Sequence, residues 1–243
     1  MIPKKIHYCW FGRNPKNTLI RKCMDSWKKH LPDYEIIEWN EDNFDVQSVR
    51  YVREAYEAKK WAFVSDYVRL WALKEYGGIY LDTDVEVFKG FDRFLEHGFF
   101  SGFENYNDKG NLYPITAVMG SVRDFWLLST VINGYHGRPF IGEDGKYDLT
   151  TNTKTISEIL TSQVGIDSEK DIYQHKKNIH IYPSNTFCIY KGDETYSVHH
   201  FNGSWLPFYV HLNNKIQNSE NIPSLVKRIS DKVTWSIRKF QSI

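Results

Sequence analysis

Apolar residues recur along the chain with two periodicities, one typical of strands and the other typical of helices. Short apolar or alternating runs in the first half predict strands at residues 5–12, 34–40 and 78–88. Apolar positions three and four apart predict helices at residues 17–32, 46–60 and 62–78. Because helices and strands alternate here, we expect an α/β domain built on a mostly parallel sheet.

The second half of the chain is richer in strand patterns. Strands are predicted at residues 97–104, 113–121, 178–190 and 195–205. Helices are predicted at residues 122–134 and 153–165. We therefore expect a mixed, mostly parallel sheet flanked by helices, which the last two strand patterns close.

The tail from Ile222 has a different pattern, with apolar residues on one face of a predicted helix and basic residues mostly elsewhere. The apolar face consists of Leu225, Val226, Ile229, Val233, Ile237 and Phe240. We expect residues 1–221 to form one globular domain and residues 222–243 to form a basic amphipathic helix. Such a helix either packs on the domain or lies on an anionic membrane surface.

Composition bears on the partners and on the compartment. The formal net charge is only +1, so no overall field attracts nucleic acid, and we expect no nucleic-acid partner. The three cysteines are scattered and odd in number, which is typical of a reduced compartment. No apolar run resembles a secretory signal or a membrane span. We therefore expect a cytoplasmic protein, which the tail can hold against the inner face of the plasma membrane.

Two aspartates, Asp82 and Asp84, stand one residue apart where the predicted strand at 78–88 is about to surface. Ligands of open α/β sheets bind at the carboxyl ends of the strands, and residues two apart on a strand point to the same side. Two such carboxylates repel each other unless a cation lies between them or one is protonated. Oxygen ligands suit Mg²⁺ or Mn²⁺, so the pair is a candidate site for a metal and a phosphate group.

Two other functions also fit an Asp-x-Asp pair. A phosphohydrolase of the haloacid dehalogenase type uses the first aspartate as a nucleophile, but its motif lies near the N-terminus, whereas more than seventy residues precede the pair here. A non-catalytic nucleotide-sugar-binding module would carry the same residues without turnover.

Three ordered blocks resemble the glycosyltransferase family 32 group, whose members include relatives of yeast outer-chain mannosyltransferases and capsular polysaccharide enzymes. The blocks are "IPKKIHYCWFG", "FVSDYVRLWALKEYGGIYLDTDVEVF" and "TYSVHHFNGSW". The group is distantly similar to the glucosylating clostridial toxins. The resemblance implies a GT-A fold, a nucleotide-sugar donor, a divalent metal and retention of anomeric configuration.

The first block implies that Trp10 stacks on the donor base, with His7 and Cys9 beside it as further donor-binding candidates. An indole at the end of a strand is a suitable platform for a base. The alternative for Trp10 is a place in the hydrophobic core.

The central block implies two catalytic residues besides Asp82 and Asp84. Asp66 and Arg69 lie three apart on one helix face. In similar enzymes this aspartate binds hydroxyls of the transferred sugar, and the arginine supports the sugar and the diphosphate. A local ion pair is the alternative. The further donor-binding candidates of this block are Ser65, Tyr80 and Thr83.

The third block implies another protein ligand to the metal. His200 is the first choice and His199 is the alternative, because alternation along a strand lets only one of the two face the site. Ser204 and Trp205 are the implied diphosphate contacts.

The middle of the chain departs from the family pattern of Thr-Gly-Pro. The sequence there is "DLTTNTKTI", in which Asn152 and Thr151 remain candidate donor contacts. Glu104 and Asn105, after the Asp-x-Asp strand, are candidates for the acceptor cleft. Residues 135–138 remain unassigned.

We therefore expect a retaining, metal-dependent hexosyltransferase with Mn²⁺ or Mg²⁺ and, by resemblance, a UDP-sugar donor. The expected acceptor is a hydroxyl of a glycan or lipid-linked oligosaccharide, in the assembly of bacterial capsule, exopolysaccharide or lipopolysaccharide.

Overall fold

The computed structural model describes most of the chain. The described residues are 1–104, 113–114, 116–202, 223–224 and 226–232. The chain divides into two compact units, Met1–His200 and Phe201–Ile243, and the elements below belong to the first. In the second unit residues 226–232 are helical, whereas the expected boundary at residue 221 and the rest of the expected tail helix lie outside the described residues.

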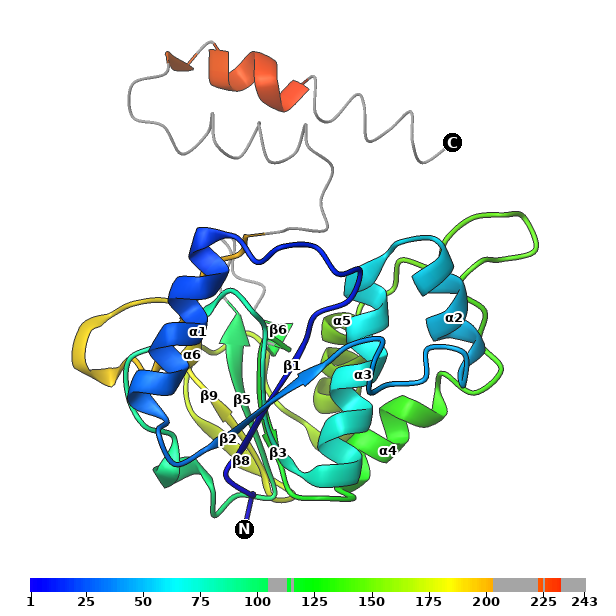
Figure 1. The fold of residues 1–243 in the computed structure, drawn as a ribbon. Helices are drawn as coiled ribbons and strands as arrows, with labels where there is room; N and C mark the ends of the chain where they lie inside the picture. The colour runs from blue at the N-terminus through cyan, green and yellow to red at the C-terminus, as the bar shows by residue number, and fades with distance from the viewer. Residues whose placement is uncertain (105–112, 115, 203–222, 225, 233–243) are drawn as a thin grey trace. The chain divides into compact units, whose positions relative to one another are not determined.

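A central mixed sheet forms the middle layer of the first unit (Figure 1). Its strands are β1 (Lys5–Cys9), β2 (Glu35–Trp39), β3 (Gly78–Leu81), β5 (Phe99–Glu104), β7 (Val118–Ser121), β8 (Gln174–Lys176) and β9 (Ile179–Tyr182), with β6 (Tyr113–Pro114) beside β5. The order is β2-β1-β3-β7-β5-β9-β8. The strands β2, β1, β3, β5 and β9 point the same way, and β7 and β8 oppose them. The expected mixed, mostly parallel sheet is confirmed.

Helices cover both faces of this sheet (Figure 1). They are α1 (Thr18–His30), α2 (Arg50–Glu57), α3 (Trp61–Tyr76), α4 (Trp126–Asn133), α5 (Asn152–Ile159) and α6 (Ser184–Phe187). A π-helical turn, Leu160–Val164, extends α5, and 3₁₀ turns lie at Asp92–Phe94 and Gly192–Glu194. Helices α1 and α6 lie on one side and α2 to α5 on the other.

Helix α3 carries charged residues among its buried positions. Its buried positions include both apolar residues and the two charged residues Asp66 and Arg69. The helix ends at Gly77, whose φ of 62° is in the region that favours glycine. Gly78 has a φ of 115° and begins β3. The Gly-Gly pair therefore reverses the chain at once, and the charged residues of α3 lie beside the strand that leads to Asp82.

The stretch 78–88 differs from the single strand that its pattern predicts. It divides into β3 and β4 (Val85–Val87), and β4 pairs antiparallel with β10 (Ser197–His199) in a separate two-stranded sheet. A turn causes the break, because the Val85 N–H donates to the Asp82 carbonyl at 3.0 Å. The prediction that residues 195–205 close the central sheet is therefore wrong. Residues 178–190 likewise contain both β9 and helix α6.

No helix within the described residues is both long enough and apolar enough to cross a membrane.

Candidate active site

The ends of three parallel strands define the site. Strands β2, β1 and β3 are parallel neighbours, so their carboxyl ends meet at one edge of the sheet. Trp10 follows β1, Asn40 follows β2 and Asp82 follows β3. Side chains with different chemistry are therefore presented side by side along this edge.

A cluster of two carboxylates and one imidazole lies after β3. One ligand atom from each of Asp82, Asp84 and His199 lies within 4.8 Å of the others. His199 Nε2 is 3.3 Å from Asp84 Oδ1, because β10 pairs His199 with Val85, the residue after Asp84. The carboxylate oxygens suit Mn²⁺ and Mg²⁺, and an imidazole nitrogen is a common metal ligand. The residues present therefore fit a divalent cation.

The electrostatics of this cluster favour positive charge. Burial alone would lower the pKa of His199. The hydrogen bond to Asp84 and the negative charges of Asp84, Asp82 and Glu104 outweigh burial and raise that pKa above its usual value. The same field would attract a cation.

His200, the first choice for the metal ligand, faces elsewhere. Its Nε2 lies 2.8 Å from Glu86 Oε2, and the same carboxylate oxygen accepts from Lys22 at 2.9 Å. The backbone N–H of His200 donates to the carbonyl of Asp84 at 3.0 Å. Because side chains alternate along a strand, His199, the alternative metal ligand predicted from the sequence, faces the two aspartates instead.

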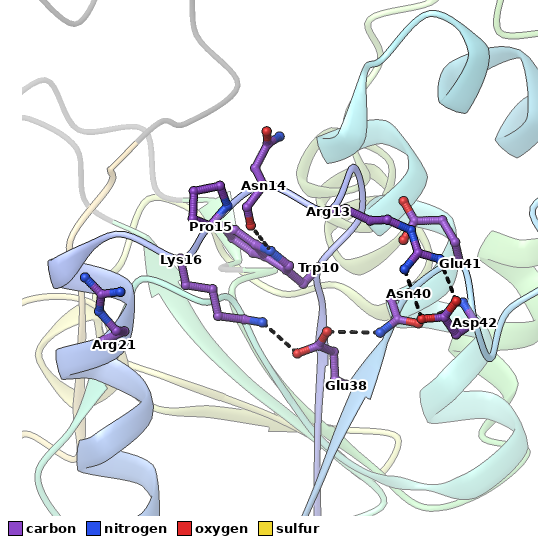
Figure 2. Close-up of a pocket in the computed structure, with 10 residues that line it drawn as sticks. All are labelled: Trp10, Arg13, Asn14, Pro15, Lys16, Arg21, Glu38, Asn40, Glu41 and Asp42. Carbon is purple, nitrogen blue, oxygen red and sulfur yellow. Dashed lines mark hydrogen bonds and ion pairs between the residues drawn. The ribbon is translucent and has the colours of Figure 1, made fainter.

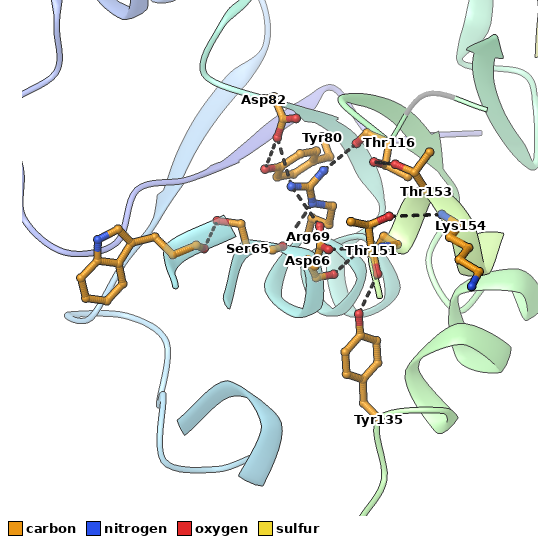
Figure 3. Close-up of polar contacts among 12 residues, drawn as sticks. Ser65, Asp66, Arg69, Tyr80, Asp82, Thr116, Tyr135, Thr151, Thr153 and Lys154 are labelled. Atoms are coloured by element: carbon orange, nitrogen blue, oxygen red, sulfur yellow. Dashed lines mark hydrogen bonds and ion pairs between the residues drawn. The ribbon is translucent and has the colours of Figure 1, made fainter. Parts of the chain in front are cut away.

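Arg69 occupies the space between α3 and β3 (Figure 3). Its Nη2 lies 3.2 Å from Asp82 Oδ1 and 3.4 Å from Asp66 Oδ1. Its Nη1 donates to the carbonyl of Thr116 at 3.0 Å, and the guanidinium carbon is 4.6 Å from the centre of the Tyr80 ring. The Tyr80 hydroxyl in turn donates to Asp82 Oδ1 at 2.8 Å. The guanidinium is therefore buried and held in one orientation.

Asp66 is a buried carboxylate on the same helix. Burial raises its pKa to about 6, although the Arg69 charge and the backbone N–H of Asn152 oppose that shift. The Asn152 N–H donates to Asp66 Oδ2 at 3.2 Å. Asn152 begins α5, with Thr151 as its N-cap. The predicted residues Asp66, Arg69, Tyr80, Asp82 and Asn152 are therefore brought together.

A cavity of about 470 Å³ lies at the ends of β1 and β2 (Figure 2). Its lining is Trp10, Arg13, Asn14, Pro15, Lys16, Arg21, Glu38, Asn40, Glu41 and Asp42. Trp10 is half-buried here, and its Nε1 donates to the carbonyl of Asn14 at 2.8 Å. The Lys16 ammonium lies 5.2 Å from the centre of the Trp10 ring and 2.7 Å from Glu38 Oε2. Trp10 thus lines a pocket and is not part of the core.

Several residues of this pocket were missed from the sequence. Glu38, Asn40, Glu41 and Asp42 lie in or directly after β2. The signal was present in "EWNED", because polar residues that follow a parallel strand next to the binding strand end at the same edge.

Two predicted donor contacts are structural residues. His7 is fully buried, with Nε2 2.8 Å from the Gly77 carbonyl and Nδ1 accepting from Trp39 Nε1 at 3.1 Å. Both ring nitrogens are therefore engaged in the interior, and the prediction that His7 binds the donor is not supported. Cys9 is also buried, and burial raises the pKa of its thiol to about 12.

The remaining candidate residues differ in where they lie and in what they contact. The Ser65 hydroxyl donates back to the carbonyl of Trp61 at 3.0 Å, within α3. Thr83 lies half-buried in the turn between the two aspartates. Glu104 is buried at the end of β5. The other candidates, Asn105, Ser204 and Trp205, lie outside the described residues.

Part of the chain, which contains several of the site residues, matches a known protein family. Residues 18–100 match the family described as "Glycosyltransferase sugar-binding region containing DXD motif". The "Uncharacterized glycosyltransferase L373" of Acanthamoeba polyphaga mimivirus is 26% identical over 227 residues, which are 85% of each chain. The matched residues 18–100 include Asp66, Arg69, Asp82 and Asp84.

Solved structures of glycosyltransferases are also similar to this chain. The PaToxG glycosyltransferase has 19% sequence identity and a TM-score of 0.49, over 67% of this chain and 70% of that one. The galactosyltransferase LgtC, solved with donor and acceptor sugar analogues, has 13% identity and a TM-score of 0.38, over 75% of this chain and 74% of that one.

Proposed function

We propose that this chain, a glycosyltransferase of the DXD sugar-binding family, transfers a hexose from a UDP-sugar to a hydroxyl of a glycan or a lipid-linked oligosaccharide. The observation that carries the proposal is the convergence of Asp82, Asp84 and His199 within 4.8 Å, next to the guanidinium of Arg69 at 3.2 Å from Asp82. A diphosphate is the donor group that such a combination of acidic, imidazole and guanidinium groups would hold through a cation.

The three clustered residues would hold Mn²⁺ or Mg²⁺. Such an ion supplies Lewis-acid stabilisation of the negative charge that grows on the leaving diphosphate. Tyr80 and Arg69 both contact Asp82 Oδ1, so the carboxylate is already oriented before any ligand arrives. That preorganisation lowers the cost of binding.

Arg69 would place positive charge beside the diphosphate. Its contacts with Asp82, Asp66 and the Thr116 carbonyl fix the guanidinium plane, so no side chain must reorganise as charge develops. A fixed, charged donor in a site shielded from water stabilises a developing anion more than a mobile surface lysine would.

Asp66 would accept hydrogen bonds from hydroxyls of the transferred sugar. Its carboxylate is buried, and it shares Arg69 with Asp82. The sugar would therefore lie beside Asp66 and Arg69 at the carboxyl end of β3, next to the diphosphate. A carboxylate that accepts from two neighbouring hydroxyls would also select among hexoses by their configuration.

The nucleoside would occupy the cavity beside Trp10. Its volume of about 470 Å³ is in the range of small-ligand sites, and it opens at the ends of β1 and β2. Since β1 lies between β2 and β3, a donor with its base against Trp10 would extend along the edge of the sheet toward Asp82. The indole face supplies stacking for the base.

We extend the proposal to retention of configuration through attack of the acceptor hydroxyl on the same face as the leaving group. The proposed setting is the cytoplasm, in capsule, exopolysaccharide or lipopolysaccharide assembly. The resemblance of the three sequence blocks supports this extension. The amphipathic pattern of residues 222–243 supports peripheral binding to a membrane.

Two measurements test the proposal. Thermal unfolding with a panel of nucleotide sugars should show a higher Tm for UDP-sugars, by mass action, and only when Mn²⁺ or Mg²⁺ is present. Incubation with acceptor glycans should then release UDP, and Asp84→Ala should abolish release while the variant keeps the wild-type Tm. Full activity in Asp84→Ala would contradict the proposal. Turnover of phosphate esters without any sugar acceptor would indicate a hydrolase instead, and binding without UDP release would indicate a non-catalytic module.

A further inference from the structure

A buried tyrosine outside the residues assigned so far points into the site from the segment after α4. Tyr135, which Figure 3 labels, is 3% exposed. Its hydroxyl donates to Oδ1 of Asn152 at 2.7 Å. Its ring packs edge-on against Tyr51 and Tyr67 at 4.8 and 5.3 Å between ring centres. The hydroxyl is thus the polar end of a side chain whose ring packs against two other aromatic rings.

Asn152 connects this tyrosine to Asp66. The Asn152 side-chain amide donates to the backbone carbonyl of Asp66, and the Asn152 backbone N–H donates to Asp66 Oδ2. A backbone carbonyl can only accept, so the NH₂ group of Asn152 must face Asp66. Its carbonyl oxygen then faces Tyr135, which donates to it. The Asp66 carbonyl therefore sets the orientation of the amide, and the Tyr135 hydroxyl anchors its oxygen end.

The contacts continue from Asp66 to the metal cluster. Asp66 Oδ1 is 3.4 Å from Arg69 Nη2, and the same Nη2 is 3.2 Å from Asp82 Oδ1. One oxygen of Asp66 thus faces Arg69 while the other accepts from Asn152. The two side-chain bonds of Asn152, to the Tyr135 hydroxyl and to the Asp66 backbone carbonyl, hold this residue in place, and its backbone N–H is the group that reaches Asp66 Oδ2. Loss of the Tyr135 bond would loosen Asn152 and with it one side of the carboxylate, because buried polar networks depend on every member being satisfied.

We propose that Tyr135 is a positioning residue for the donor sugar, which acts through Asn152 to hold the Asp66 carboxylate in the orientation that the sugar hydroxyls require. This inference rests on the proposed function, because it takes Asp66 as the sugar-binding carboxylate. It assigns no contact between Tyr135 and the nucleotide, so it predicts an effect on the sugar half of the donor alone.

Tyr51 offers a matched control for the Tyr135 hydroxyl. Both rings are buried, they pack against each other, and the guanidinium of Arg138 lies 5.1 and 5.2 Å from their centres. Among the described residues, however, the Tyr51 hydroxyl has no hydrogen-bond partner. Phenylalanine at either position keeps the ring and removes only the hydroxyl, so the two variants differ in the bond to Asn152.

The experiment compares Tyr135→Phe and Tyr51→Phe in the full chain with Mn²⁺. The measured quantities are the Kd for UDP, and the Kd and KM for the UDP-sugar that wild type binds best. Tyr135→Phe should raise the Kd and KM for the UDP-sugar roughly tenfold, the effect of one lost buried hydrogen bond, and should leave the Kd for UDP within twofold. Tyr51→Phe should change neither. Equal weakening of UDP and UDP-sugar, or no change in Tyr135→Phe, would overturn the inference.

A double-mutant cycle with Asn152→Ala tests the route of the effect. If Tyr135 acts through Asn152, then adding Tyr135→Phe to Asn152→Ala should change the Kd for the UDP-sugar by less than twofold. A full tenfold change in that background would overturn the inference. If wild type binds no UDP-sugar, the proposed function and this inference both fail; if wild type binds one and Tyr135→Phe binds it equally well, only this inference fails.

Discussion

Arg69 Nη2 lies 3.2 Å from Asp82 Oδ1, so a buried guanidinium of helix α3 directly adjoins the first aspartate of the Asp-x-Asp pair. The same guanidinium contacts Asp66 and the carbonyl of Thr116. One arginine therefore links the helix, the strand end and the β6–β7 segment. Its planar, forked donor geometry is what allows three acceptors to be served at once.

Replacing Arg69 by lysine tests this arrangement. Lysine keeps the charge but cannot reach all three acceptors, so kcat for sugar transfer should fall roughly a hundredfold, the typical cost of losing one preorganised donor. Arg123→Lys is the control, because the Arg123 side chain is largely exposed and pairs only with Asp124 among the described residues. A kcat within twofold of wild type in Arg69→Lys would show that charge alone is sufficient.

Substitution of the two neighbouring histidines distinguishes their roles. His199→Ala should weaken Mn²⁺ binding at least tenfold more than His200→Ala does, because only His199 lies with Asp82 and Asp84. The measurement is the Kd for Mn²⁺ in the absence of donor, by calorimetry or electron paramagnetic resonance. A larger loss in His200→Ala would restore the first sequence-based choice.

Removal of the Trp10 indole should weaken nucleotide binding. Base stacking on an aromatic ring contributes about 1–3 kcal/mol, so Trp10→Ala should raise the Kd for UDP between about fivefold and about 150-fold. The KM for the acceptor should change little, because the nucleoside, and not the acceptor, is proposed to occupy the Trp10 cavity. Trp126→Ala, at a partly exposed position on α4, is the control. Equal changes in the donor and acceptor constants would argue against stacking.

His7 should contribute to loss of stability in acid. Burial, partly opposed by the bond to the Gly77 carbonyl, lowers its pKa to about 4, whereas an unfolded histidine titrates near 6.5. Between these values the unfolded chain binds a proton that the folded chain does not, so the free energy of unfolding falls as pH falls from about 6.5 to about 4. The contribution is about 3 kcal/mol at the acid end.

Denaturant unfolding at a series of pH values measures this effect. His7→Gln should be less stable than wild type at pH 7, because it loses buried hydrogen bonds, but its stability should decline less between pH 6.5 and pH 4. His136→Gln, on the exposed segment after α4, should keep the wild-type slope. An unchanged slope in His7→Gln would show that other groups cause the acid sensitivity.

The sequence predicted most elements of the fold because their signals are local. The apolar spacing of residues 62–78 and the Gly-Gly break identify α3 and the start of β3, and with them the neighbourhood of Asp66, Arg69 and Asp82. Polar residues directly after apolar strands likewise indicated the edge of the sheet where the site lies. These signals can be read without knowing which strand pairs with which.

The features that sequence reasoning missed depend on distant partners. The break between β3 and β4 reflects the pairing of β4 with β10, more than a hundred residues later. Which of His199 and His200 faces the aspartates depends on the register of β10, and a shift of one residue would exchange them. In the structure His200 instead contacts Glu86, which also accepts from Lys22. His7 shows the same limit, because alternation along β1 does not tell that its two ring nitrogens meet the Trp39 indole and the Gly77 carbonyl.

His199, the proposed third metal ligand, lies on β10, the final strand that the structure describes in the first unit. During translation, Asp82 and Asp84 leave the ribosome more than a hundred residues before His199. A nascent chain can therefore complete its central sheet before the ion-binding set is whole. If the proposed site is right, the chain can bind its donor through a metal ion only when nearly all of the first unit has been synthesised.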